Sequence, residues 1–369
     1  MAETTHTGGS LAQRSFDRIL LIKPSSLGDV IHALPVLHGL RRRYPDATID
    51  WLVESSLVEL VEGHADVDRI VPFDRRRFGR MGYSMRAAGR FVGFIRAIRE
   101  RAYDLAIDLQ GLFRSGFLAR ACGASVRIGF DDAREGAAMF YTHHVGPAPN
   151  DMHAVDRNYQ VADLLGFGDV PVTFNFRVDP KARDEARSLL AGGSDDKTLI
   201  AIVPGARWET KRWAPKRFAE AIDQLADDGR AKCVVLGGPD EATLCSHICE
   251  LCTSDPLNLA GRTGLSTLAA LVESVDVLLC HDSGVMHLAV ALHKPLVCLT
   301  GPTNPRRTGP YRRLADVVRL SLECSPCYYR KLSQCPIDHE CMRELPTSAV
   351  VEAVRRALHK SPAHAETSG

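Results

Sequence analysis

The sequence lacks the features that mark membrane-spanning, secreted and nucleic-acid-binding proteins. No apolar run approaches the roughly 20 residues needed to cross a bilayer; the best candidate, residues 288–299, is interrupted by His293, Lys294 and Pro295. The first residues show no basic stretch followed by an apolar core, so we expect no secretion signal. Lys and Arg number 46 against 45 Asp and Glu, whereas a nucleic-acid binder normally has a basic excess. We expect a soluble, cytoplasmic protein without a nucleic-acid partner.

Two phosphate-binding fingerprints are also missing. No Gly-x-Gly-x-x-Gly follows the first apolar segment, which argues against a dinucleotide dehydrogenase. No Gly-x-x-x-x-Gly-Lys-Ser/Thr occurs, which argues against a P-loop kinase or ATPase. The 11 cysteines are scattered over 369 residues, and this spacing favours free thiols over a disulfide framework. Hydrophobic residues at 45% and charged residues at 25% are ordinary for a globular protein.

Short apolar segments alternate with helical patterns twice along the chain. Ile19–Ile22 has the length and boundary of a buried strand, and the apolar spacing over Val30–Arg43 predicts a helix after it. The alternation restarts at Leu199–Val203 and continues to Leu296–Leu299. Such alternation is typical of a parallel sheet covered on both faces. We therefore predict an α/β protein with two Rossmann-like, doubly wound domains that face each other across a ligand cleft.

The domain boundaries follow from shifts in composition. The prediction is an N-terminal domain over residues 16–180, a C-terminal domain over residues 195–345, and a final helix and tail over residues 346–369. The charged, Gly-containing stretch within residues 176–197 is interpreted as a linker or domain edge. Residues 130–149, with Gly, Pro and two histidines, are interpreted as a loop.

The junction after the first strand contains a candidate general base. In residues 23–29 (KPSSLGD), Asp29 lies at or just inside the start of the next helix, where the helix dipole favours its charged form. A carboxylate in a cleft, preceded by a flexible loop, suits a general base. Capping of the helix explains the same residue at least as well. Both roles therefore stay open on the local sequence.

Residues 281–287 (HDSGVMH) predict an anion site at the start of a helix. Ser283 and Gly284 leave backbone N–H groups at the helix N-terminus, where anions bind. His287 lies one turn along the same face as Ser283, and a purely structural helix start does not explain it. Thr300, at the end of the next expected strand, is expected to line the same pocket.

Two other junctions in the second half have simpler explanations available. In residues 204–213, Lys211 is placed to reach a phosphate, although a solvated basic loop explains this segment equally well. Residues 237–241 combine two glycines with acidic residues after a strand, a pattern that binds ribose hydroxyls and also suits a turn with an acidic cap. Phosphate held in the second half, with a base in the first, favours group transfer from a nucleotide-activated donor.

Four segments in sequence order carry a resemblance to a known family. They are residues 22–30 (IKPSSLGDV), 108–111 (DLQG), 211–213 (KRW) and 282–287 (DSGVMH). The chain resembles the glycosyltransferase family that includes the ADP-heptose:lipopolysaccharide heptosyltransferases, over residues 18–346. Each segment is weak alone, but four in order are specific. The resemblance implies a GT-B fold, an inverting reaction without metal or cofactor, an ADP-sugar donor, and an anionic glycolipid acceptor reached at the inner face of the cytoplasmic membrane.

The resemblance also implies roles for single residues. Asp29 is expected to take the proton from the acceptor hydroxyl, and Glu241 to bind the donor ribose. The implied donor-binding residues are Lys211, Glu241, Asp282, Ser283, Gly284, His287, Arg207 and Thr300. The implied acceptor-binding residues are Ser26, Gly28, Gln110, Arg114 and Arg134. Arg207 and Trp208 stand where some relatives carry small hydroxyl residues, so we expect that part of the pocket to differ.

Two other functions stay open. One is a nucleotide-sugar epimerase or hydrolase on the same two-domain fold, which would release sugar without an acceptor. The other is a non-catalytic nucleotide-sugar-binding protein. The joint presence of Asp29, Lys211 and His287 argues against the second, because a degenerate binder has no need of a base.

Two short patterns are interpreted as structural. Asp66 and Asp68 have the Asp-x-Asp spacing of metal-dependent glycosyltransferases but precede a short expected strand, so we predict a turn. Cys245, Cys249 and Cys252 have the spacing of an iron–sulfur site. They lie on one face of an expected helix, however, and are predicted to pack in the core.

Two further clusters leave a functional alternative. The cysteines Cys324, Cys327, Cys335 and Cys341, with His339 between them, are close enough in sequence for a zinc site. Structural thiols are the preferred interpretation. Residues 75–90 are rich in arginine beside Phe78, Met81 and Tyr83. They are interpreted as a solvated surface, with a patch for anionic lipid headgroups or a phosphorylated lipid acceptor as the alternative.

Overall fold

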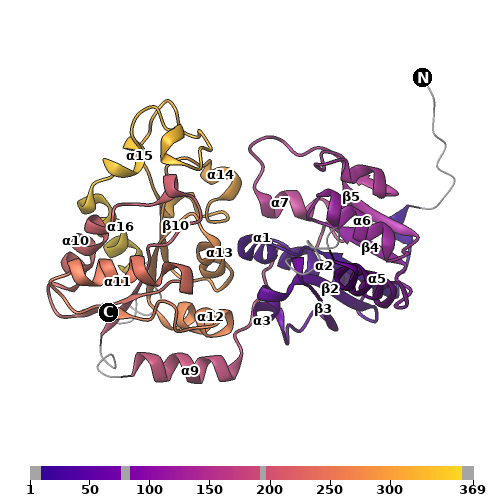
Figure 1. Cartoon of the computed structure of the whole chain (residues 1–369), viewed down its shortest axis with the longest axis horizontal. Helices are drawn as coiled ribbons and strands as arrows, with labels where there is room; N and C mark the ends of the chain where they lie inside the picture. The colour runs from indigo at the N-terminus through magenta and orange to yellow at the C-terminus, as the bar shows by residue number, and fades with distance from the viewer. Residues whose placement is uncertain (1–9, 76–83, 192–196, 360–369) are drawn as a thin grey trace. The chain divides into compact units, whose positions relative to one another are not determined.

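The structure is a computed structural model that describes residues 10–75, 84–191 and 197–359. It divides into an N-terminal unit, residues 1–175, and a C-terminal unit, residues 176–369. Figure 1 shows that each unit is built from a sheet with helices packed around it. The units are described separately below.

The described residues of the N-terminal unit form a sheet of six parallel strands in the order β3-β2-β1-β4-β5-β6. The central strands are buried on both faces, which is why they are almost entirely apolar. The strands are β1 (Arg18–Ile22), β2 (Thr48–Glu54), β3 (Arg69–Phe73), β4 (Leu105–Asp108), β5 (Val126–Phe130) and β6 (His143–Val145).

Helices and short 3-10 turns connect these strands. They are η1 (Leu11–Gln13), α1 (Leu27–Ile31), α2 (Leu34–Arg43), η2 (Ser55–Leu57), α3 (Val58–Val61), α5 (Met85–Arg99), α6 (Phe113–Ala121), η4 (Ala137–Phe140), α7 (Ala154–Tyr159) and α8 (Val161–Leu165). Buried side chains from β1 and β4 pack with those of α5 and α6 in one hydrophobic core.

The described residues of the C-terminal unit repeat this architecture, with six parallel strands in the order β12-β11-β10-β7-β8-β9. The strands are β7 (Thr198–Val203), β8 (Ala231–Val235), β9 (Leu257–Asn258), β10 (Val277–His281), β11 (Leu296–Leu299) and β12 (Val317–Val318). The main helices are α9 (Pro180–Leu190), α10 (Pro215–Ala226), α11 (Ala242–Leu251), α12 (Leu265–Ser274), α13 (Gly284–Ala291) and α16 (Thr347–His359). Shorter elements are η5 (Glu209–Lys211), η6 (Pro239–Glu241), α14 (Pro305–Thr308), η7 (Leu314–Asp316), η8 (Leu332–Gln334) and α15 (Glu340–Arg343).

Both sheets have a point at which the order of the strands reverses. In the N-terminal unit it lies between β1 and β4, and in the C-terminal unit between β7 and β10. Ligands of doubly wound sheets bind outside the carboxyl ends of the strands at such a switch point. Ligand-binding residues are therefore expected in the four loops that follow β1, β4, β7 and β10.

The structure adds a helix that the sequence did not predict and corrects one local prediction. Helix α9 lies just before the stretch expected to be a linker, and its buried Ala182, Ala186 and Leu190 lie at helical spacing. Residues 192–196 of that stretch lie outside the described residues. Asp179 caps this helix by accepting a hydrogen bond from the N–H of Lys181. The segment 130–149, expected to be a loop, contains η4 and the edge strand β6. We find no helix among the described residues long and apolar enough to cross a membrane.

Candidate active site

In the N-terminal unit a buried lysine connects the loop after β1 to the loop after β4. Lys23 is 5% exposed, and its Nζ donates a hydrogen bond of 2.8 Å to the carbonyl oxygen of Leu109. The same Nζ lies 3.7 Å from Oδ1 of Asp29. Burial lowers the pKa of Lys23, and the nearby carboxylates of Asp29 and Asp108 oppose that shift. In its protonated form the lysine places a positive charge beside Asp29.

Asp29 caps helix α1 and is also accessible to solvent. Its Oδ2 accepts hydrogen bonds from the backbone N–H of Ser26 at 2.8 Å and from the Ser26 hydroxyl at 2.9 Å. The Asp29 side chain is nevertheless 41% exposed. The cap therefore exists and does not bury the carboxylate, so the two roles left open by the sequence are compatible. Gly28, an expected acceptor residue, is buried within α1.

Asp108, the last residue of β4, organises the loop that carries Gln110. Its buried carboxylate accepts hydrogen bonds from the backbone N–H groups of Gln110 at 2.8 Å and Gly111 at 3.2 Å, and from the Tyr141 hydroxyl at 2.7 Å. Burial raises the pKa of Asp108, and these donors partly offset the shift. Gly111 has a φ of +64°, which a side chain would strain. The backbone N–H of Arg134 donates to the Gly111 carbonyl oxygen at 2.9 Å, and the Arg134 side chain is exposed.

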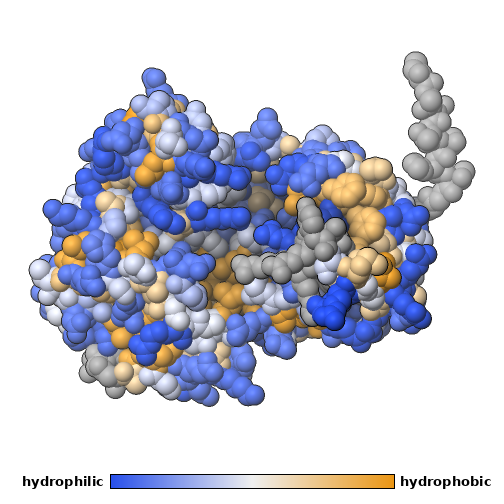
Figure 2. All heavy atoms as spheres, viewed as in Figure 1, coloured by the Kyte–Doolittle hydropathy of each residue, from blue (hydrophilic) through white to orange (hydrophobic). Residues whose placement is uncertain are grey.

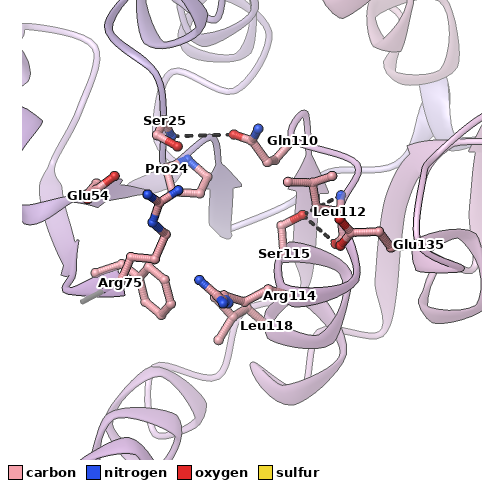
Figure 3. A pocket seen from close by; sticks show the side chains of 11 residues that line it. Pro24, Ser25, Glu54, Arg75, Gln110, Leu112, Arg114, Ser115, Leu118 and Glu135 are labelled. Atoms are coloured by element: carbon pink, nitrogen blue, oxygen red, sulfur yellow. Dashed lines mark hydrogen bonds between the residues drawn. The ribbon is translucent and has the colours of Figure 1, made fainter. Parts of the chain in front are cut away.

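A pocket of about 210 Å³ lies beside these loops (Figure 3). The guanidinium groups of Arg75 and Arg114 extend into it from the region after β3 and from α6. Gln110 lies at its upper edge, where its Oε1 is 3.5 Å from the backbone N of Ser25. Of the expected acceptor residues, Gln110 and Arg114 line this pocket. The complete lining is Pro24, Ser25, Glu54, Phe73, Arg75, Gln110, Leu112, Arg114, Ser115, Leu118 and Glu135.

In the C-terminal unit Lys211 and Asp282 form a mostly buried ion pair at the switch point. Lys211 Nζ lies 2.8 Å from Asp282 Oδ2 and 3.1 Å from the Asp282 carbonyl oxygen. The two side chains are 14% and 5% exposed. Oδ2 also accepts a hydrogen bond of 2.7 Å from the Thr303 hydroxyl and lies 3.4 Å from that of Thr308. The ring of Trp208 lies 4.6 Å from Nζ, a favourable cation–π distance.

Helix α13 begins directly after this ion pair. The first N–H groups of a helix lack intrahelical partners and attract anions. Ser283 is the residue before the helix, and its Oγ is buried without a hydrogen-bond partner among the described residues. The Oγ1 of Thr300, just after the neighbouring strand β11, is also buried without a hydrogen-bond partner among these residues. His287 is only 7% exposed, so little of its ring is accessible to a ligand.

The carboxylate of Glu241 packs against the backbone of Gly205. A Cβ at position 205 would lie 1.8 Å from Oε1 of Glu241, so a side chain there would displace the carboxylate. Oε2 of Glu241 accepts a hydrogen bond of 3.0 Å from the N–H of Gly238. Gly205 follows β7 and Gly238 follows β8, and these strands are paired. A carboxylate at the carboxyl edge of a doubly wound sheet is suited to accept hydrogen bonds from ribose hydroxyls.

His281, the last residue of β10, was not among the predicted site residues. It is fully buried, and its Nε2 accepts a hydrogen bond of 2.9 Å from the backbone N–H of Trp213. Burial lowers the pKa of His281 to about 4, so the ring is neutral at pH 7. The Trp213 indole donates in turn to the carbonyl oxygen of Leu345 at 3.1 Å. A histidine at the end of an apolar strand was the only sequence signal of this contact.

The loop after β7 presents an arginine to solvent. Arg207, one of the expected donor-binding residues, is exposed. Arg212 stabilises this loop by donating from Nε to the carbonyl oxygen of Ala206 at 2.9 Å. The guanidinium of Arg330 lies 5.0 Å from the Trp208 ring.

The side chains of the Asp-x-Asp motif and of the helical cysteine motif contact other residues of their own units. Oδ2 of Asp66 lies 3.0 Å from Nδ1 of His38 and accepts a hydrogen bond of 2.7 Å from Asn175. Oδ2 of Asp68 accepts one of 2.6 Å from Arg41. Asp66 lies in a turn, which confirms the prediction. The three cysteines of α11 and its end pack on the hydrophobic core of the C-terminal unit, as expected: Cys245, Cys249 and Cys252.

The second cysteine cluster gives the zinc alternative no support. Among the described residues, no group of three or more His, Cys, Asp or Glu is arranged to hold a metal ion. Burial raises the pKa of Cys341 to about 11, and the nearby Cys327, Cys335 and Cys324 add to the shift. Nε2 of His339 lies 2.5 Å from the Thr210 carbonyl oxygen, so this ring nitrogen already has a partner.

Comparisons with known proteins agree on one family. The model of "Glycosyltransferase family 9 (heptosyltransferase)" matches residues 91–337. The chain is 29% identical over 326 residues to lipopolysaccharide heptosyltransferase 1 of Pseudomonas aeruginosa, which covers 88% of this chain and 89% of the relative.

Two solved structures have the same overall fold. A glycosyl transferase family 9 protein from Veillonella parvula aligns with a TM-score of 0.79 at 24% identity, over 95% of this chain and 100% of that one. The E. coli heptosyltransferase WaaC with ADP-2-deoxy-2-fluoro heptose aligns with a TM-score of 0.71 at 25% identity, over 92% and 99%. The expected GT-B fold with its two parallel sheets is therefore confirmed.

Proposed function

Because this chain belongs to glycosyltransferase family 9, we propose that it transfers a heptose, or a similar sugar, from an ADP-sugar to the inner core of a lipopolysaccharide. Its relative from Pseudomonas aeruginosa is named lipopolysaccharide heptosyltransferase 1, and the E. coli heptosyltransferase structure contains ADP-2-deoxy-2-fluoro heptose. The observation that carries the proposal is that the two switch points present different side chains. One presents an accessible carboxylate, and the other presents a lysine beside a helix start.

The C-terminal unit binds the donor in this proposal. Lys211 uses two of its three N–H groups on Asp282, and in this proposal the third donates to a diphosphate oxygen. The N-terminus of α13 and the hydroxyls of Ser283 and Thr300, which have no partner among the described residues, supply further donors to the same group. Glu241 accepts hydrogen bonds from the ribose. Gly284 and Arg207 contact the donor at the edges of this site, and His287 contributes only through its small exposed edge.

The N-terminal unit binds the acceptor in this proposal. Arg75 and Arg114 give the pocket two positive charges that suit a carboxylate or phosphate on an anionic sugar. Gln110 supplies an amide for sugar hydroxyls. Arg134 is exposed beside the Gly111 loop and meets the acceptor outside the pocket, with Ser26 near the reacting hydroxyl.

Asp29 acts as the general base. Its ionised carboxylate takes the proton from the acceptor hydroxyl as the hydroxyl oxygen forms a bond to the anomeric carbon. The bond from that carbon to the diphosphate oxygen breaks, and ADP leaves with the electron pair. A single displacement of this kind inverts the anomeric configuration. Lys211 and the α13 N-terminus stabilise the charge that develops on the departing diphosphate.

The proposed reaction uses no metal ion and no cofactor. The Asp-x-Asp carboxylates, which bind metal in other glycosyltransferases, are occupied here by His38, Asn175 and Arg41. The positive charge needed at the diphosphate comes instead from Lys211 and the helix N-terminus. Chelator treatment is expected to leave turnover unchanged.

The experiment that tests the function measures ADP released from ADP-heptose with and without a lipopolysaccharide inner-core acceptor. Transfer predicts ADP release that depends on the acceptor and a heptosylated product by mass spectrometry. Release of free sugar without acceptor would instead identify a hydrolase or epimerase. Donor binding without any turnover would identify a non-catalytic binding protein.

A further inference from the structure

One surface of the N-terminal unit exposes large apolar side chains. It is formed by α5, α6 and η4, and we refer to it as the aromatic–arginine surface. Its exposed apolar residues are Met85 at 89%, Val92 at 66%, Phe113 at 48%, Phe117 at 36% and Met139 at 75%. An apolar patch of this kind on a folded protein marks a surface that contacts another apolar phase or a partner.

Aromatic contacts join the three elements into one continuous patch. Phe91 of α5 stacks on Phe117 of α6 with ring centroids 6.2 Å apart. Phe117 and Phe113 both contact Phe140 of η4, at 6.2 and 5.2 Å. Figure 2 shows apolar side chains gathered over the region where Figure 1 places α6. These contacts therefore link α5, α6 and η4 through Phe91, Phe117, Phe113 and Phe140. The exposed Met85 and Val92, seven positions apart, lie on one side of α5.

The same part of the chain carries a concentrated positive charge. Residues 75–99 contain eight arginines and no Asp or Glu, although the whole chain has a net charge of only +1. Arg86 and Arg90 lie on α5 and are exposed; Arg76, Arg77 and Arg80, with Phe78, Met81 and Tyr83, lie outside the described residues. A solvated basic face, the simpler interpretation of the sequence, does not account for the exposed apolar side chains among the arginines.

We infer that the aromatic–arginine surface binds the face of an anionic lipid bilayer. Exposed apolar side chains of a helix insert at the boundary between headgroups and acyl chains, and arginines around them bind lipid phosphates. Each basic residue near an anionic bilayer adds about 1 kcal/mol of binding free energy, or roughly a fivefold change in affinity. Apolar and basic groups on one face fit this partner better than an acidic protein surface, which would not need the exposed Met85 and Val92.

Helix α6 connects this surface to the pocket. Phe113 and Phe117 are exposed on one side of α6, whereas Arg114 and Leu118 line the pocket. This step rests on the proposed function: an acceptor anchored in the bilayer by acyl chains would enter the pocket next to the surface that binds the bilayer. Membrane contact would then deliver the sugar part of the acceptor without removing its lipid from the membrane.

The test is co-sedimentation of the full chain with lipid vesicles. We expect binding to vesicles of phosphatidylcholine mixed with phosphatidylglycerol, weaker binding to phosphatidylcholine alone, and loss of the difference at high salt. Absence of binding to the anionic vesicles would overturn the inference. Soluble glycerol phosphate, added in excess, serves as the free-phosphate arm. Complete release by it would show that the surface binds a phosphate group and not a bilayer.

Paired variants separate the surface from the rest of the molecule. Arg86→Glu/Arg90→Glu should weaken vesicle binding by at least roughly 25-fold, from roughly fivefold for each arginine. Val92→Asp/Met139→Asp should also weaken it. The matched controls lie on the C-terminal unit: Leu251→Asp/Leu314→Asp, exposed 42% and 44%, and Arg187→Glu/Arg355→Glu. Equal effects of controls and surface variants would overturn the inference, and circular dichroism confirms that each variant is folded.

Activity assays distinguish failure of the inference from failure of the proposed function. Surface variants should transfer sugar to a deacylated acceptor at the wild-type rate and lose transfer to the acceptor in vesicles. If the chain binds vesicles but transfers to neither acceptor, the function is wrong and the surface stands. If it transfers equally well to both acceptors in every variant, the function stands and the surface is wrong.

Discussion

The two units place a lysine and an aspartate at equivalent switch points but hold the pairs differently. In the N-terminal unit, Lys23 Nζ lies 3.7 Å from Asp29, whose side chain is 41% exposed. In the C-terminal unit, Lys211 Nζ lies 2.8 Å from Asp282, whose side chain is 5% exposed and has threonine hydroxyls around it. The Asp29 carboxylate is accessible to a ligand, whereas the Asp282 carboxylate is buried and bonded to side chains of its own unit.

The difference shows that one topology holds its two lysine–aspartate pairs in different environments. An accessible carboxylate beside a more distant cation is able to take a proton from a ligand. A buried carboxylate that already accepts several hydrogen bonds instead holds its lysine in place. The predictions below test this division, beginning with the variant that should have the largest effect.

Removal of the accessible carboxylate should stop the chemistry and spare the donor site. Asp29→Ala is expected to slow turnover by roughly 10²–10⁴-fold, the usual contribution of a general base, with little change in ADP affinity. Asp29→Asn should have the same effect on turnover and ADP affinity, and its amide oxygen can still accept a hydrogen bond at the helix cap. Acceptor-dependent ADP release and calorimetric titration with ADP measure the two quantities. Wild-type turnover in either variant would remove the base assignment.

Removal of the buried carboxylate should instead affect stability. Asp282→Ala leaves the mostly buried Lys211 without its anion, and breaking a buried pair in this way costs roughly 3–5 kcal/mol. Asp29→Ala loses mainly a helix cap, which is worth about 1 kcal/mol. Urea unfolding followed by tryptophan fluorescence compares the two. Equal losses of unfolding free energy would show that the two pairs are held alike.

The stability of the two units should respond to acid in opposite directions because of two buried groups, His281 and Asp108. The pKa of His281 is lowered to about 4 from an ordinary value near 6.5, so the unfolded chain binds the proton more readily. Its contribution to the stability of the C-terminal unit is complete above pH 6.5 and is lost as the pH falls to about 4, by roughly 3 kcal/mol. The pKa of Asp108 is raised, so this group stabilises the N-terminal unit as the pH falls.

Single-tryptophan variants measure this contrast. Trp51 is buried in the N-terminal unit and Trp213 in the C-terminal unit, so each reports the unfolding of its own unit in urea at pH 7 and pH 5. We expect the C-terminal unit to lose more stability between these values, and His281→Gln to flatten its pH dependence. A C-terminal unit that keeps its slope in His281→Gln would contradict the assignment.

The smallest predicted effect concerns the cation beside Asp29. Lys23→Met keeps the buried apolar stem and removes the positive charge, which favours the ionised form of a neighbouring carboxyl. The acid limb of the pH profile of kcat/KM should therefore move up by roughly one pH unit. Lys181→Met, on the exposed start of α9, is the control. An unmoved acid limb would show that Lys23 acts only as a structural donor to Leu109.

The strands at the centre of each sheet could be predicted from sequence because burial on both faces makes them continuous apolar runs. The segment Leu296–Leu299 forms β11 with the same bounds, and Ile19–Ile22 lies within β1. Helix α9 was missed because its buried stripe consists of two alanines and one leucine among charged residues. Strand β6 has three residues, which is too short for any periodicity to show.

The candidate site could be predicted only in part, for a related reason. Asp29 and Lys211 follow apolar strands, so their place at a sheet edge is encoded locally. Their partners are not: the bond between Lys211 and Asp282 joins residues 71 positions apart, and that from Lys23 to Leu109 joins residues 86 apart. The pairing of strands decides such contacts. The same holds for His281, which meets Trp213 only because β10 lies beside β7.

The tight fit of Gly205 beneath Glu241 constrains how this molecule can change. Any methyl group at position 205 would displace the Glu241 carboxylate, which binds the ribose in the proposed function. In that proposal, nucleotide preference depends jointly on two loops, one after each of two paired strands. A lineage that altered one loop would have to adjust the other, so sugar-nucleotide choice here should diversify in coordinated pairs of substitutions rather than one residue at a time.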